Sequence, residues 1–148
     1  MRVDAGCRTA DPAIFAAGEV TMHFNPLLGR HVRIESWQVA ENQPAVAAAN
    51  ALGADDTYAE LPWLWSDQYE CNLQMLGLFG SEHAIVVRGD PASGAFTAFG
   101  LAHDGRIVAV AAANAGRDIG ASRRLIAAGA TPDPARLADP AVNLKAFL

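Results

Sequence analysis

The alternation of apolar and polar positions predicts a set of strands in the second half of the chain. Residues 71–76 alternate with the period of two that is typical of a strand, and residues 84–87 form a run rich in β-branched side chains. Residues 95–102 and 106–112 are two more apolar runs. The Asp104-Gly105 pair between them is typical of a β-hairpin with a type I′ turn, so these segments predict an antiparallel sheet.

Helix signals follow the predicted strands. Residues 115–128 read as a helix that Gly129 terminates. Asp133-Pro134 and Asp139-Pro140 each combine an N-cap residue with a proline suited to the first helical position, so a short helix is expected after each pair. Residues 58–148 are therefore expected to be an α+β domain, an antiparallel sheet with flanking helices.

The first half has a different pattern. Residues 13–17 form a short apolar run between Asp11-Pro12 and Gly18, which predicts a buried parallel strand. Residues 21–32 contain several turn formers and are expected to be a loop. A lone parallel strand cannot cover both of its faces, so this half is interpreted as the end of an α/β domain whose other strands are absent.

One helix is predicted in the first half, over residues 36–52. Ser36 is suited to cap its N-terminus and Gly53 to end it. Pro44 lies inside the segment and is expected to kink or split the helix. Residues 55–61 then read as a linker.

Composition excludes several classes of function. The chain has 148 residues, 51% of them hydrophobic, which is enough for a packed core. No apolar run approaches the roughly 20 residues of a membrane-spanning helix, and residues 1–4 lack the apolar core of a secretory signal, so a soluble cytoplasmic protein is expected. The net charge of -5 argues against a nucleic-acid partner.

Common catalytic and metal-binding patterns are not found. Cys7 and Cys71 form no CxxC pair and are expected to be reduced structural thiols. The histidines have no ligand-like spacing, and no Ser-His-Asp or paired-carboxylate pattern stands out. We therefore assign no catalytic residue and no metal ligand from the sequence.

Three motifs carry a family resemblance. They are TADPAIFAAGEV at residues 9–20, RIESW at residues 33–37 and PWLWSDQY at residues 62–69. Together they resemble the back third of FAD-dependent, NADH-linked ferredoxin reductases of the putidaredoxin reductase and rhodocoxin reductase type. The resemblance divides the chain into a remnant of an α/β FAD-binding domain (residues 1–57) and a reductase C-terminal domain used for interface contacts or dimerisation (residues 58–148).

The resemblance implies four FAD-binding residues, each with a simpler structural alternative. Glu19 stands where the family has an aspartate that binds the ribityl chain, and otherwise it is an exposed loop acid. Ser36 and Trp37 begin a helix whose N-terminus points at the flavin in the family, and otherwise they are a cap and a packing residue. Trp65 corresponds to a tryptophan beside the isoalloxazine ring, and otherwise it belongs to an aromatic cluster covering one end of the sheet.

The function implied is that of the C-terminal portion of an oxidoreductase. Such an enzyme passes electrons from NADH through FAD to an iron–sulfur protein that serves an oxygenase. The chain has no GxGxxG turn to hold a dinucleotide pyrophosphate, so by itself we expect it to bind no FAD or NADH and to be inactive. The alternative is a non-enzymatic dimerisation or partner-binding module.

Two partners are expected. Apolar residues in the first half that an absent domain should cover favour a homo-oligomer, namely Ile14, Phe15, Val39, Val46 and Leu52. The resemblance implies a 2Fe-2S ferredoxin as partner of the parent enzyme. Arg117, Arg123 and Arg124 could steer such an acidic protein, although a solvated helix face is the commoner role of such residues.

Overall fold

A computed structural model describes all residues from Met1 to Leu148. The chain divides into two compact units, Met1–Pro62 and Trp63–Leu148. We call them the N-terminal unit and the C-terminal unit and describe each by itself. The domain boundary expected after residue 57 stays a prediction, as does the identity of the first domain.

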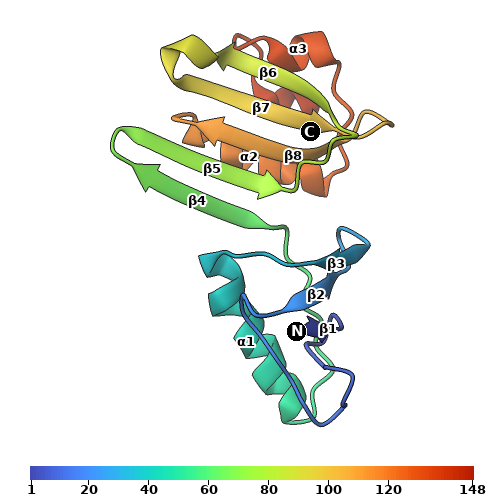
Figure 1. The fold of residues 1–148 in the computed structure, drawn as a ribbon. Helices are drawn as coiled ribbons and strands as arrows, with labels where there is room; N and C mark the ends of the chain where they lie inside the picture. The colour runs from blue at the N-terminus through green and yellow to red at the C-terminus, as the bar shows by residue number, and fades with distance from the viewer. The chain divides into compact units, whose positions relative to one another are not determined.

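The N-terminal unit combines three short strands with one long helix (Figure 1). Strand β1 (Arg2–Val3) pairs in parallel with β2 (Met22–Asn25), which pairs antiparallel with β3 (Arg30–Val32). Helix α1 spans Trp37–Ala51. Val3, Val32, Val39 and Tyr58 are buried in the core of this unit.

Two predictions for this unit are wrong. Residues 13–17 do not form a buried parallel strand, because their segment makes only an isolated antiparallel bridge between Phe15 and Arg8, and Ile14 is 50% exposed. A strand needs a neighbour along its length, and this segment has none. Residues 21–32 are not one loop, because they contain β2 and β3. The turn formers mark only the apex, where the Asn25 side chain accepts the N–H groups of Leu27 and Leu28.

The helix prediction is confirmed at both ends. The Ser36 hydroxyl accepts the Val39 N–H at 3.4 Å, as an N-cap does. At the other end Gly53 takes a φ of 99°, and the N–H groups of Gly53 and Ala54 bond to carbonyls of the last turn, which is a Schellman motif. Pro44 does not split the helix, which is continuous through it.

Side-chain amides attach α1 to the loops beside it. Buried Gln43 accepts the Gly18 N–H at 2.7 Å and the Thr21 hydroxyl at 3.0 Å. In the last turn of α1, Asn50 donates to the Gly6 carbonyl and also bonds both main-chain groups of Asp56. These bonds satisfy main-chain groups that lie outside any strand ladder, so irregular loops can be buried at little cost.

The C-terminal unit is a five-stranded sheet with the strand order β4-β5-β8-β7-β6, and every neighbouring pair is antiparallel. The strands are β4 (Trp63–Gln68), β5 (Cys71–Gly77), β6 (Ala84–Asp90), β7 (Ala95–Leu101) and β8 (Ile107–Ala113). The α+β class with an antiparallel sheet is confirmed. Strand β4 was not predicted, because the PWLWSDQY motif that contains it was interpreted as an aromatic cluster or a flavin-facing segment and not as a strand.

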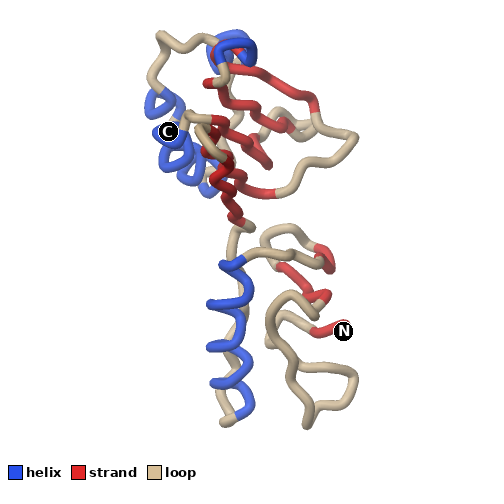
Figure 2. Tube along the Cα trace, turned by 60° about the vertical axis from the view of Figure 1, so that its left-hand side comes forward, coloured by secondary structure: helices blue, strands red, loops and turns tan.

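Helices α2 (Gly116–Ala127) and α3 (Pro134–Ala138) lie on one side of this sheet (Figures 1 and 2). Short 3-10 turns occur at Pro91–Ser93 and Leu144–Phe147. The core between the layers is formed by side chains with no exposed surface, namely Leu76, Phe99, Val110, Leu125 and Leu137.

The predicted helix caps of this unit have mixed outcomes. Gly129 ends α2 with a φ of 63°, and Asp133 caps α3 by accepting the Arg136 N–H, as predicted. The helix expected after Asp139 is wrong. There the Asp139 carboxylate accepts the Ala141 N–H within a single turn, so its capping chemistry is used without a helix following.

The β7–β8 hairpin is confirmed, but its turn differs from the predicted type I′. Gly105 donates to the Ala102 carbonyl at 2.9 Å, and the register shifts between Gly100 and Leu101. Only Gly105, at a φ of 83°, has a positive φ in the loop. The connection is therefore a three-residue loop with a left-handed glycine at its end.

Arg88 of β6 fastens the C-terminal segment of the chain to the sheet. Its guanidinium donates to the main-chain carbonyls of Leu137, Asp139, Pro140 and Val142. Its Nε lies 3.4 Å from the Asp118 carboxylate of α2, which also accepts the Thr97 hydroxyl. The Arg88 side chain is only about a tenth exposed, so its bonds to α2 and to the C-terminal segment lie in the interior of the unit.

Gly105→Val should destabilise the C-terminal unit by about 1–2 kcal/mol, because a β-branched residue is strained at positive φ. A Cβ at this position would meet nothing closer than 4.0 Å, so backbone strain alone is tested. Thermal unfolding followed by circular dichroism measures the change, expected to be a fall in Tm of several degrees. Gly120→Ala in open space on α2 is the control and should be neutral or stabilising; an unchanged Tm for the valine variant would contradict the turn assignment.

Arg88→Met should cost at least about 2 kcal/mol of unfolding free energy, because several carbonyls and a carboxylate lose a partner together. Arg88→Lys should rescue only part of the loss, since an ammonium cannot reproduce the planar guanidinium fork. Urea unfolding measures both. Arg124→Met, at an exposed position, should change stability by less than about 0.5 kcal/mol, and equal losses at positions 88 and 124 would refute this role of Arg88.

Candidate functional site

The N-terminus of α1 is the first part of the candidate site. Ser36 satisfies the Val39 N–H, and no acidic residue lies in the first turn of the helix. The positive end of the helix dipole is therefore not offset by a carboxylate from its own first turn. An anionic or electron-rich group placed there would be stabilised by the N–H groups and by the dipole.

Trp37 is the first residue of α1 and presents a large apolar surface. It is 61% exposed, and it is one of the largest exposed side chains of the N-terminal unit. The simpler alternative, that Trp37 is a packing residue beside the helix cap, stays a prediction. An exposed indole next to an uncompensated helix terminus can contact both the face of a planar ligand and its polar edge.

Glu19 lies in a turn near this helix terminus. The turn runs from Gly18 to Thr21, with a Thr21 N–H to Gly18 carbonyl bond of 3.0 Å. Arg33 joins it to the helix entrance: its Nε donates to the Glu19 carbonyl at 3.1 Å, and its Nη2 lies 2.9 Å from the Glu35 carboxylate. The Glu19 side chain itself is exposed. The structure thus brings Glu19, Ser36 and Trp37 to one region of the N-terminal unit.

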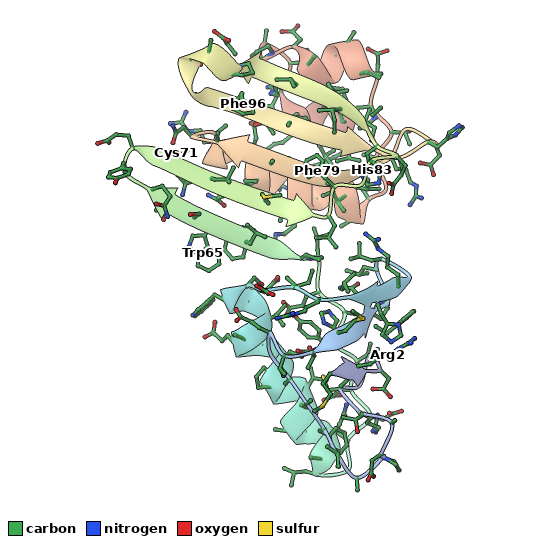
Figure 3. The ribbon with its side chains drawn as sticks, viewed as in Figure 1. Arg2, Trp65, Cys71, Phe79, His83 and Phe96 are labelled. Atoms are coloured by element: carbon green, nitrogen blue, oxygen red, sulfur yellow. The ribbon has the colours of Figure 1, made fainter.

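Trp65 belongs to the other unit, where it projects from edge strand β4 (Figure 3). Its ring centroid is 4.7 Å from that of Trp63, with an angle of 32° between the ring planes. Trp65 is 38% exposed, so an aromatic surface remains available at this edge of the sheet. The aromatic cluster expected as an alternative therefore exists, and it includes an accessible indole.

Three residues support these side chains, and the sequence did not indicate this role for any of them. Gln43 fixes the Gly18 turn, Arg33 joins that turn to the helix entrance, and Arg123 lies 5.4 Å above the Trp63 ring. Arg33 stands inside the RIESW motif, which gave a signal that could have been used. Gln43 and Arg123 act through contacts distant in the sequence, so no local pattern marks them.

A buried polar cluster lies beneath the strands of the N-terminal unit. His23 is 1% exposed, its ring meets Tyr58 edge to face at 5.3 Å, and neither ring nitrogen has a hydrogen-bond partner. Burial and then nearby His31 hold the pKa of His23 below its usual value. Burial also raises the pKa of the Cys7 thiol to about 11, and burial together with Glu60 raises the pKa of Tyr58. These groups stay neutral near pH 7.

A cleft of about 660 Å³ lies elsewhere in the same unit, between β1 and residues 55–57. Arg2, Arg8 and His31 line it, together with three aspartates. Arg2 bonds to His31, and Arg8 pairs with Asp55 at 3.5 Å, so its charges largely compensate one another. None of the four predicted site residues lines this cleft.

Three general features complete the description. No group of three or more His, Cys, Asp or Glu side chains is placed to hold a metal ion. No helix combines the length and the apolar character needed to cross a membrane. Both cysteines are free thiols, with Cys7 buried and Cys71 exposed.

Comparison with known proteins identifies the family. A family model described as reductase C-terminal matches residues 63–148, and the chain belongs to this family. Over all 148 residues the chain is 83% identical to the anthranilate 1,2-dioxygenase system ferredoxin–NAD(+) reductase component of Burkholderia cepacia, of which it covers 36%. The chain thus spans about a third of the length of the curated relatives it matches.

Solved structures agree with this assignment. The ferredoxin reductase for the CYP199A2 system from Rhodopseudomonas palustris is 31% identical over the whole chain with a TM-score of 0.88, and 37% of that structure is covered. Putidaredoxin reductase in its covalent complex with putidaredoxin is 35% identical over 99% of the chain with a TM-score of 0.87, with 35% of it covered. The resemblance to reductases of the putidaredoxin reductase type is confirmed.

The stability of the N-terminal unit should fall as the pH drops below about 6.5, the ordinary pKa of histidine. His23 has a lowered pKa in the folded chain, so protons bind more readily to the unfolded chain and favour it. The loss should approach at most about 1.4 kcal/mol per pH unit. Urea unfolding of the wild type and of His23→Phe at several pH values tests this, and a slope that survives in the phenylalanine variant would rule out His23 as its source.

Proposed function

We propose that this chain is the C-terminal portion of an FAD-dependent ferredoxin reductase that passes electrons from NADH to an iron–sulfur protein serving an oxygenase. The observation that carries the proposal is the 83% identity, over the full 148 residues, to a reductase component of a dioxygenase system. A cytoplasmic location and a 2Fe-2S ferredoxin partner are part of the same proposal.

Each of the four candidate residues is chemically suited to contact a flavin. Trp37 and Trp65 offer exposed aromatic surfaces, and the α1 terminus offers N–H groups with no acid in the first turn. Ser36 holds that terminus in shape, and Glu19 is an exposed carboxylate that could accept a hydrogen bond from a ribityl hydroxyl. This chain has no binding site for the pyrophosphate of FAD, since no glycine-rich turn leads into a helix.

FAD and this chain would contribute different parts of the chemistry. When bound, FAD supplies the step from two-electron to one-electron transfer. The chain's own contribution is to offer indole surfaces on which the ring would pack and to stabilise negative charge at its edge through the α1 dipole. No residue of this chain is assigned a proton-transfer or nucleophilic role.

A non-enzymatic dimerisation or partner-binding module remains the second candidate, because several large apolar side chains are exposed to solvent. Leu52 is 90% exposed, Leu27 59% and Ile14 50%. Val39, which was expected to be among them, is buried at 2%. Exposed apolar side chains of this kind favour association with another protein surface.

The isolated chain should bind neither FAD nor NADH stably, because the residues that would hold the pyrophosphate are missing. Titration with FAD, read by tryptophan fluorescence, should show no saturable quenching in the micromolar range. Trp37→Phe and Trp65→Phe serve as controls for non-specific absorption by the flavin. Saturable quenching in the wild type would contradict the expectation that the isolated chain binds no FAD. If Trp37→Phe and Trp65→Phe lost this quenching, the result would support the proposed flavin contacts of the two indoles.

A chimera tests the function itself. In it this chain replaces the corresponding C-terminal third of the Burkholderia cepacia reductase. The chimera should retain FAD and reduce the ferredoxin of that system with NADH, and Trp65→Ala should lower the rate at least about tenfold if the indole lines the electron path. Surface variant Arg106→Gln is the matched control. A folded chimera without flavin would overturn the proposal.

The chain in solution should be a homodimer or a larger assembly. Light scattering over a range of concentrations measures the mass. Leu52→Ser together with Ile14→Ser should shift the assembly toward monomer, while exposed Ala48→Ser should leave it unchanged. A monomer at high concentration would remove dimerisation as a candidate function.

A further inference from the structure

Three side chains of the C-terminal unit form a stack that begins on α2 and ends at the exposed edge of the sheet. The Arg123 guanidinium lies 5.4 Å from the centre of the Trp63 ring. The Trp63 ring in turn lies 4.7 Å from that of Trp65. We call this set the Arg123 stack. Its two indoles are two residues apart on β4, so they share the face of the sheet that α2 covers.

The two indoles are supported differently. Trp63 stands opposite Leu76 of β5, which has no exposed surface, whereas Trp65 stands opposite Gln74. Strand β4 is an edge strand. The Trp65 ring contacts the Trp63 ring, and the Trp63 ring contacts the Arg123 guanidinium, so a change at Arg123 can reach Trp65 through Trp63.

The arginines of α2 are not equivalent. All three are exposed and none forms an ion pair, but Arg123 alone among them contacts an aromatic ring. A guanidinium remains charged at every physiological pH and is planar, so it can both stack on an indole and attract its π electrons. Arg123 combines these properties at the one point where α2 reaches Trp63.

We propose that Arg123 is a positioning residue, which holds Trp63 and through it sets the orientation of the Trp65 ring. The proposal deepens the proposed function, in which Trp65 faces a flavin, and it assigns Arg123 to the aromatic wall rather than to the steering of an acidic partner. Removal of the guanidinium should raise the population of unstacked conformers of the indole pair about two- to fivefold.

The experiment uses the complete 148-residue chain without any cofactor. Two indoles in contact produce an exciton couplet in the far-ultraviolet circular dichroism. Trp63→Phe and Trp65→Phe should each abolish it, which assigns the signal to this pair and not to Trp37. Arg123→Met should then lower its amplitude, at an unchanged helix content, by the amount that a rise of about two- to fivefold in the unstacked population removes from the stacked one. Arg123→Lys, which keeps the charge without the plane, should retain an intermediate amplitude.

Arg124→Met is the matched control, because it removes a neighbouring arginine from the same helix, and it should leave the couplet unchanged. A full couplet in Arg123→Met would overturn the proposal, as would an equal loss in Arg124→Met. Because no flavin is present, these outcomes are independent of the chimera experiment. The proposal for Arg123 can be refuted while the reductase function is supported, and the reductase function can be refuted while the proposal for Arg123 is supported.

Discussion

The main chain of an irregular segment must find hydrogen-bond partners once it is buried, and both units meet this constraint with single polar side chains. In the C-terminal unit, Arg88 donates to the Leu137 carbonyl of α3 and to three carbonyls of the segment that follows it. In the N-terminal unit, Gln43 accepts the Gly18 N–H and Asn50 donates to the Gly6 carbonyl, in loops that run beside α1. The position of Glu19 depends on one of these bonds, because Glu19 lies in the turn that Gln43 holds.

This arrangement explains how a short stretch of irregular chain can present functional groups in fixed places. The Gly18 turn has only brief strands to support it, yet it is joined to the helix through Gln43 on one side and Arg33 on the other. Likewise, Trp65 lies on an edge strand, and its neighbour Trp63 connects it to α2 through Arg123. In both units, a helix fixes the position of a group that lies outside it.

The sequence predicted those features that depend on near neighbours. Ser36 and Gly53 define α1, Gly105 defines the hairpin, and alternation defines most of the antiparallel sheet. The failures involve distant contacts. Residues 13–17 have the apolar character of a strand but no partner strand, and Asp139 has the chemistry of a cap without a helix to follow. For the site, motifs marked Glu19, Ser36, Trp37 and Trp65, whereas Gln43 and Arg123 act across the fold and leave no local signal.

The unequal environments of the two thiols have a practical consequence. Cys7 is fully buried, and its raised pKa of about 11 leaves almost no thiolate, whereas Cys71 is exposed at the start of β5, next to the β4–β5 turn (Figure 3). A thiol-directed reagent therefore meets one accessible sulfur on the native chain. That sulfur lies on the strand paired with the one that carries Trp65, so a fluorophore or spin label can be attached near the aromatic edge without changing a single residue.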